Sequence, residues 1–143
     1  MYDLKELHIA RSIPGYLSEE NEQAFLIQWA KRNVSTYPEL SRLHHIPNGG
    51  GRSKSQGALL KLTGVKPGVP DLMLPCPRFG RHGLYIELKS LDPKSRPSKE
   101  QKDWIAYLQA VGYEAVVCHG FEAARDEIIN YLNPKETYSP GVI

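Results

Sequence analysis

The stretch GLYIELKS, residues 83–90, has the clearest strand pattern of the chain, because leucine, isoleucine and leucine alternate with tyrosine, glutamate and lysine. Alternation over so short a run predicts a half-buried β-strand. The next segment, 98–111, opens with capping-box spacing between Ser98 and Gln101, and Gly112 follows it where a C′ glycine ends a helix. Residues 114–118 then predict a buried strand. Strand, helix and strand form a βαβ unit with parallel strands and a right-handed crossover, which indicates an α/β fold.

Further elements before and after this unit complete one domain. The predicted segments are a helix from Ser18 to about Asn33, a short strand over 43–46, a helix from Ser53 through Leu62 with capping-box spacing to Gln56, a strand over 71–74 and a last helix over 121–132. The 143 residues are too few for two ordinary domains. We therefore expect a single domain, residues 1–143 with a core of about 18–132, in which helices flank both faces of a small mixed sheet.

The composition excludes some classes of protein and favours a polyanionic partner. The chain has no run of 18 apolar residues, no signal-peptide core at its N-terminus, and two cysteines, Cys76 and Cys118, without metal-like spacing. We expect a reduced, cytoplasmic protein without a membrane span. Residues 42–102 hold twelve Lys or Arg against four Asp or Glu, a balance of +8, whereas the rest hold six against twelve. This basic segment suits nucleic acid, although charge alone fits a solvated face equally well.

Three acidic residues occupy positions that folding alone does not require. Glu87 and Lys89 lie two apart on the 83–90 strand, so their side chains project from the same sheet face. Asp71 begins the preceding strand, and Glu22 lies on the apolar stripe of the first predicted helix. Taken singly, each has an ordinary explanation as an ion-pair partner, a turn residue or a first-turn glutamate.

Taken together, these residues match a known pattern. Pro70-Asp71, then fifteen residues, then Glu87-Leu88-Lys89 resembles the PD-(D/E)xK signature of metal-dependent nucleases. The segments GVKPGVPDLML (64–74) and YIELK (85–89), with the helix start at 98–101, are similar to the stand-alone phage or bacterial type of the VRR-NUC family, the virus-type replication-repair nucleases. IPNGG (46–50) also resembles phage-encoded members. The resemblance extends from about Ser18 to Leu132 and departs from the family at 91–97, where relatives often have a shorter link that contains glycine.

The resemblance implies a restriction-endonuclease-like fold and a metal-dependent, structure-selective DNA endonuclease. Asp71, Glu87 and the backbone carbonyl of Leu88 would hold the metal, with Glu22 as a direct or water-mediated ligand. Lys89 would orient the attacking water and stabilise the transition state. Three carboxylates within about 5 Å repel one another by on the order of 3 kcal/mol per pair, so such a cluster requires a cation. Oxygen ligands indicate Mg²⁺ or Mn²⁺ and not zinc.

Gln101 and the basic residues extend this predicted site. The capping box explains Gln101 as a structural residue, whereas the resemblance places it near the active site, where it could contact the water or a phosphate; the two roles are compatible. The basic segment is expected to line the DNA approach. The candidate DNA-binding residues are His45, Asn48, Arg52, Lys54, Lys66, Arg96 and Lys99, and Lys61, Arg78, Arg81 and Lys94 belong to the same basic segment.

Symmetry suggests how such a small domain would act on branched DNA. A two-fold homodimer supplies the two sites that cut a four-way (Holliday) junction, as in DNA repair. Candidate interface elements are the last helix and the N-terminal residues Tyr2, Leu4, Leu7 and Ile9.

Two alternatives stay open, a monomeric flap or nicking nuclease and a non-catalytic basic DNA-binding module. His44-His45 resembles the start of an HNH nuclease motif, but no asparagine occurs between Asn48 and Asn130, which excludes that class. One of these two histidines is expected to face inward and the other outward.

Overall fold

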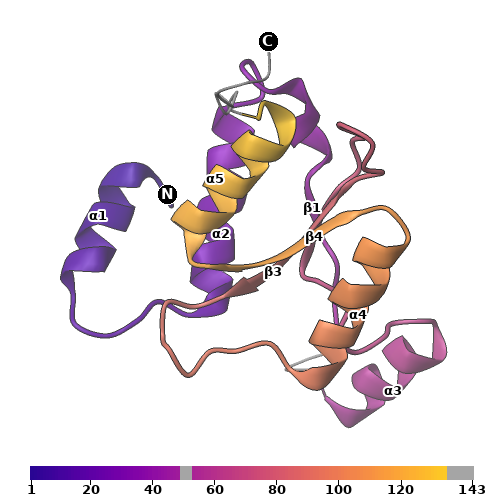
Figure 1. Ribbon diagram of the computed structural model, residues 1–143. Coiled ribbons are helices and arrows are strands. Elements are labelled where there is room, and N and C mark those ends of the chain that lie inside the picture. The colour runs from indigo at the N-terminus through magenta and orange to yellow at the C-terminus, as the bar shows by residue number, and fades with distance from the viewer. Residues whose placement is uncertain (49–52, 135–143) are drawn as a thin grey trace.

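The computed structural model describes residues 1–48 and 53–134, and its centre is a mixed four-stranded sheet (Figure 1). The strands β1 (His44–His45), β2 (Leu72–Leu74), β3 (Leu84–Lys89) and β4 (Glu114–His119) lie in the order β1-β2-β3-β4. The first three are antiparallel neighbours, whereas β3 and β4 run parallel. The predicted strand–helix–strand unit and the α/β fold are therefore confirmed.

Helices accompany the sheet along the described part of the chain. They are α1 (Leu4–Ser12), α2 (Glu19–Arg32), the 3-10 helix η1 (Pro38–Arg42), α3 (Lys54–Leu62), α4 (Lys99–Ala110) and α5 (Phe121–Leu132). The hydroxyls of Ser18, Ser53 and Ser98 cap α2, α3 and α4, as predicted. The complete capping box forms between Ser98 and Gln101, whereas at Ser53 only the serine half of the predicted box is found.

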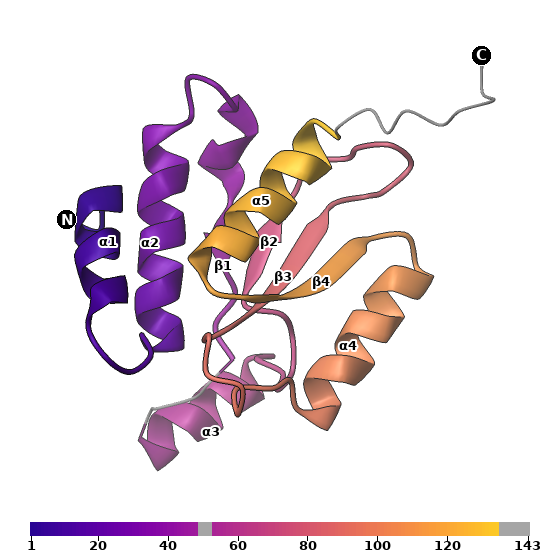
Figure 2. The same ribbon diagram turned by 60° about the vertical axis from the view of Figure 1, so that its left-hand side comes forward.

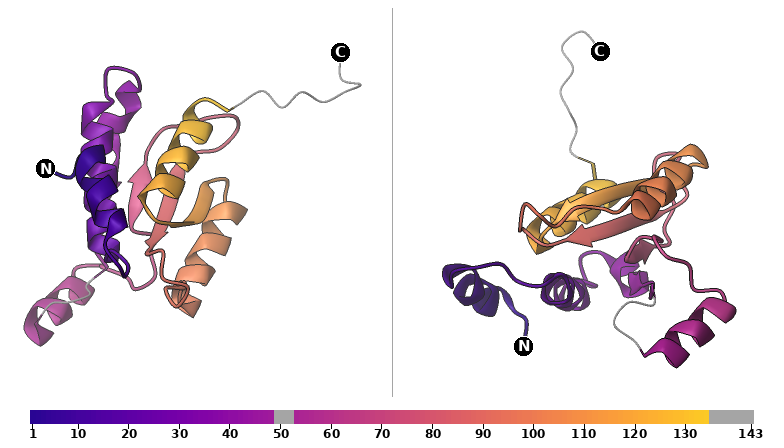
Figure 3. Two further views of the ribbon diagram at one scale, coloured as in Figure 1. Left: turned by 90° about the vertical axis from the view of Figure 1, so that its left-hand side faces the viewer. Right: turned by 90° about the horizontal axis from the view of Figure 1, so that it is seen from below.

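The core lies between one face of the sheet and the helices α2 and α5. The β3 residues Leu84, Ile86 and Leu88 are at most 1% exposed and belong to one apolar cluster with Leu26 of α2 and Ile128 of α5. Each such burial stabilises the fold by about 1.5–3 kcal/mol. The intervening residues of β3 face the other side, where α4 packs along β4. Figure 3 shows α2 and α4 on opposite sides of the strands, and Figure 2 shows α1 beside α2.

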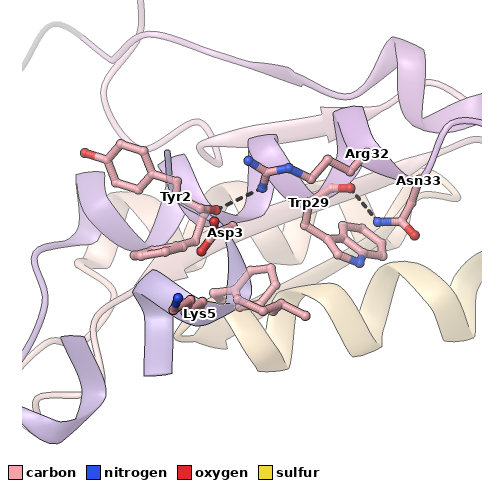
Figure 4. A pocket seen from close by; sticks show the side chains of 9 residues that line it. Tyr2, Asp3, Lys5, Trp29, Arg32 and Asn33 are labelled. Atoms are coloured by element: carbon pink, nitrogen blue, oxygen red, sulfur yellow. Dashed lines mark hydrogen bonds between the residues drawn. The ribbon is translucent and has the colours of Figure 1, made fainter. Parts of the chain in front are cut away.

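The N-terminal helix α1 was not predicted, although a local signal for it exists. Asp3 is the N-cap of a complete capping box, and Leu7 is the buried residue of the helix. Tyr2 packs edge-on against Phe25 of α2, with 5.0 Å between ring centroids. A pocket of about 350 Å³ remains between this segment and α2, beside Trp29 (Figure 4). Tyr2 and Leu7 therefore provide apolar contacts between the N-terminal segment and the core.

The edge strand β1 differs from its prediction. It has two residues instead of four, and both His44 and His45 are exposed, so the expected inward-facing histidine is absent from this strand. Both rings instead bond through Nδ1 to backbone carbonyls, of Arg42 at 2.9 Å and of Asp71 at 3.0 Å. The physical reason is that β1 pairs on one side only and lies outside the apolar cluster. Within residues 1–48 and 53–134, no helix is long and apolar enough to cross a membrane.

Candidate active site

The pairing of β2 with β3 brings Asp71 and Glu87 together at one end of the sheet. Leu72 pairs with Ile86 in antiparallel register, so Asp71 and Glu87 are opposite each other one step further along the strands. The N–H of Leu88 donates to Oδ2 of Asp71 at 2.9 Å and orients that carboxylate. Two acids that have fifteen residues between them in sequence are therefore a cross-strand pair in the folded protein.

Glu87 is a buried acid that is not fully satisfied. Its side chain is 1% exposed; Oε1 accepts from Nε2 of Gln101 at 3.0 Å, and Oε2 is buried without a hydrogen-bond partner in the described residues. Burial, followed by the charge of Asp71 and hydrogen bonding with it, raises the pKa of Glu87 to about 8, against the opposing effect of Lys89. An additional positive charge, either a proton or a cation, would stabilise this pair of carboxyl groups.

Lys89 lies between two carboxylates. It is 7% exposed, and its Nζ is 3.5 Å from Oε1 of Glu87 and 3.7 Å from Oε1 of Glu19, in the first turn of α2. The sequence analysis did not predict Glu19 or Ser95, whose hydroxyl donates to the same Oε1 at 2.9 Å. The available signal for Glu19 was its position one helical turn before Glu22, but helical spacing alone does not decide which of two such acids reaches the sheet.

The start of α4 lies directly beside the pair. Gln101 accepts from the N–H of Ser98 through Oε1 at 2.7 Å and donates to Glu87 through Nε2, so the capping contact and the contact with Glu87 coexist. Gly68 allows the preceding turn to approach this helix. A Cβ there would lie 2.7 Å from the backbone carbon of Glu100, and the φ of +89° favours glycine.

Glu22 does not join Asp71 and Glu87. It is completely buried, its two oxygens bind both terminal nitrogens of Arg11, and its Oε1 also accepts from the N–H of Phe121 at 3.0 Å. These partners belong to α1 and α5, whereas Glu87 lies on the other face of the sheet, where Gln101 of α4 contacts it. The expected convergence of three carboxylates is therefore not found: in the described ranges, no group of three or more His, Cys, Asp or Glu side chains is placed to hold a metal ion.

Several predicted DNA-binding residues are exposed. His45 binds the backbone carbonyl of Asp71, and Lys99 begins α4, so both lie near the acidic pair. The other exposed members of the predicted set in the described residues are Asn48, Lys54, Lys66 and Arg96. Arg52 lies outside the described residues. The exposed Lys61 and Lys94 extend the same basic segment.

Arg78 and Arg81, two further members of the basic segment, lie away from the acidic pair. They lie in the connection between β2 and β3, at the end of the sheet opposite Asp71. Arg78 forms an ion pair with Glu39 at 2.8 Å, and Arg81 is 3.7 Å from Glu114. Their charges are therefore directed to acids of η1 and β4, because the antiparallel register separates the turn from the acidic end of the strands.

Known proteins are similar to this chain over most of its length. Residues 17–122 match the family described as the VRR-NUC domain. A solved structure described as a VRR_NUC domain protein is 32% identical, with a TM-score of 0.70, and the alignment covers 85% of this chain and 93% of that chain. The comparison with curated proteins found no match. The matched range contains Glu19, Asp71, Glu87, Lys89 and Gln101.

Proposed function

Because the chain belongs to the VRR-NUC family, whose domain is a nuclease domain, we propose that it is a deoxyribonuclease that hydrolyses phosphodiester bonds with Mg²⁺ or Mn²⁺. The observation that supports this most is the cross-strand pair of Asp71 and Glu87. Oε2 of Glu87 is buried and has no hydrogen-bond partner among residues 1–48 and 53–134, and Lys89 lies beside the other oxygen of this carboxylate. A pure binding module has no need for two adjacent acids that destabilise each other when both are charged.

The residues at this end of the sheet fit a hard divalent cation. We expect Asp71, Glu87 and the backbone carbonyl of Leu88 to hold the metal through oxygen atoms. Glu19 replaces Glu22 as the acid from the first sheet-packed helix, because Glu19 contacts Lys89 whereas Arg11 neutralises Glu22. When bound, the cation polarises the scissile phosphate and lowers the pKa of an attacking water.

Lys89 and Gln101 have separate roles in this proposal. The ammonium group of Lys89 is held on a nearly buried stem, where its charge is screened less than on an open surface. It orients the attacking water and stabilises negative charge that develops on the phosphate. Gln101 is held at its oxygen by the N–H of Ser98, so its amide remains directed at Glu87 and fixes the orientation of that carboxylate.

Paired aspartate variants test the ligand assignment. Asp71→Asn keeps the shape of the side chain and removes its charge, so it should lose both the Mn²⁺ isotherm in calorimetry and DNA cleavage. The matched control is Asp126→Asn, an exposed acid of α5 that pairs with Arg125 and should bind Mn²⁺ like the wild type. Equal Mn²⁺ binding by Asp71→Asn and the wild type would contradict the assignment. A wild type that binds DNA without cutting it would instead identify a non-catalytic binding module.

We further propose branched DNA, above all four-way junctions in DNA repair, as the substrate and a homodimer as the active form. Leu4 and Ile9 of α1 are 62% and 54% exposed, which supports an interface on this helix. Leu7 is buried, and the apolar face of α5 belongs to the core, so these two earlier candidates do not contribute apolar surface to an interface.

A cleavage panel tests both statements at once. Duplex, flap, fork and four-way-junction DNA are compared with Mg²⁺ or Mn²⁺, and light scattering gives the mass in solution. Twice the monomer mass together with preference for the junction supports the proposal. A monomer that prefers flaps identifies a flap or nicking nuclease and leaves the Asp71–Glu87 chemistry unchanged.

A further inference from the structure

The loop that follows β3 is folded by its own hydrogen bonds. The N–H of Asp92 donates to Oγ of Ser90 at 3.2 Å, and the side chain and carbonyl of Asp92 accept from the N–H groups of Lys94 and Ser95 at 2.9 and 2.8 Å. Such local bonds to short polar side chains define a turn. They determine where the side chain of Ser95 projects.

The hydroxyl of Ser95 connects this loop to α2. It accepts from the N–H of Ser90 at 3.2 Å and donates to Oε1 of Glu19 at 2.9 Å. An N–H only donates and a charged carboxylate only accepts. The hydroxyl of Ser95 therefore accepts from Ser90 and directs its single proton toward Glu19. The oxygen that receives it is the one that lies 3.7 Å from Nζ of Lys89.

We propose that Ser95 is a positioning residue of the nuclease site, which holds the Glu19 carboxylate beside Lys89. This inference rests on the proposed function, in which Lys89 acts at the reacting phosphate. The Glu19 side chain is 42% exposed, so a free carboxylate there would have several rotamers available. The bond from Ser95 selects the rotamer that faces Lys89, and it does so from the loop that joins β3 to α4.

Substitutions of Ser95 test the positioning role. Ser95→Ala should lower kcat on DNA by about tenfold, the effect of losing one hydrogen bond to a charged group, with KM nearly unchanged. Ser95→Thr retains a hydroxyl and should remain within about twofold of the wild type. The control is Ser41→Ala, because the exposed Ser41 donates to the backbone of Pro38 in η1. A kcat of Ser95→Ala equal to that of Ser41→Ala would overturn the proposal.

A double-mutant cycle separates positioning from a general structural role. If Ser95 acts through Glu19, then Ser95→Ala should have no further effect on kcat in a Glu19→Ala background, which has no side-chain acceptor for the hydroxyl, whereas additive effects would overturn the proposal. The same four proteins can be compared by urea unfolding without metal. The free energies of unfolding then measure the contact between Ser95 and Glu19 independently of DNA cleavage. A wild type that cleaves no DNA would overturn the proposed function. In that case, non-additive losses of unfolding free energy for the Ser95 and Glu19 variants still support the contact between these two side chains. Additive losses would overturn it.

Discussion

Arg11 is the counter-ion of a carboxylate that has no access to water, which makes Arg11→Ala a sharp test of the structure. Both oxygens of Glu22 bind the guanidinium, and this hydrogen bonding raises the pKa of Arg11 further above its usual range. After truncation, the N–H of Phe121 would be the one hydrogen-bond partner left to the Glu22 side chain in the described part of the chain. Removing one partner of a buried ion pair costs about 3–5 kcal/mol. The Arg11 side chain is 23% exposed, so water can replace part of the lost interaction, and we expect a loss of about 2–3 kcal/mol.

Urea and thermal unfolding followed by circular dichroism measure this loss. For a chain of this size, about 2–4 °C of Tm corresponds to 1 kcal/mol, so Arg11→Ala should lower the Tm by roughly 4–12 °C. Arg125→Ala removes an ion pair with the exposed Asp126 and the contact of Arg125 with the Phe121 ring, and should cost about 1 kcal/mol. Adding Glu22→Gln to Arg11→Ala should recover stability, because a neutral amide needs no counter-ion. If Arg11→Ala and Arg125→Ala unfold alike, the dependence of Glu22 on Arg11 is refuted.

The proposed site and its surroundings lead to four more expectations. Lys89→Ala should nearly abolish cleavage while Mn²⁺ and DNA binding stay close to wild type, and activity above a few per cent would exclude Lys89 from the reaction. Glu87 has a pKa of about 8 in the fold against 4.5 in the unfolded chain, so the free energy of unfolding of the metal-free protein should fall as the pH rises through this range, by up to about 1.4 kcal/mol per pH unit. Glu87→Gln should flatten this dependence of stability on pH, and identical urea-unfolding results for both proteins across the range would contradict the expectation. Gly68→Ala should lower the Tm because its Cβ would meet the backbone of Glu100, so an unchanged melting curve would show that the turn moves freely. DNA affinity should be equal for a scrambled duplex and should fall steeply with salt, whereas a flat salt response in a binding titration would argue against the basic surface.

The sequence by itself determined the elements of the fold that depend on near neighbours. The alternation in β3, the serine caps of α2 and α4 and the turn at Gly112 each involve residues a few positions apart, and each is found in the structure. The segments around Asp71 and Glu87 were identified instead by their resemblance to the VRR-NUC family, and the family match includes both. It did not identify α1, because the capping box at Asp3 precedes a helix with little apolar periodicity.

Only the tertiary structure decided which acid of α2 faces the site. Glu19 and Glu22 are one turn apart, and although the apolar stripe places Glu22 on the core side, helical spacing does not say which of the two acids reaches Lys89. The packing of α2 against the sheet and α5 turns Glu22 into the core side, where Arg11 and Phe121 bind it, and leaves Glu19 beside Lys89. Ser95 is likewise 76 positions from its partner. Such contacts depend on the relative placement of whole elements, which non-local packing sets and no short stretch of sequence encodes.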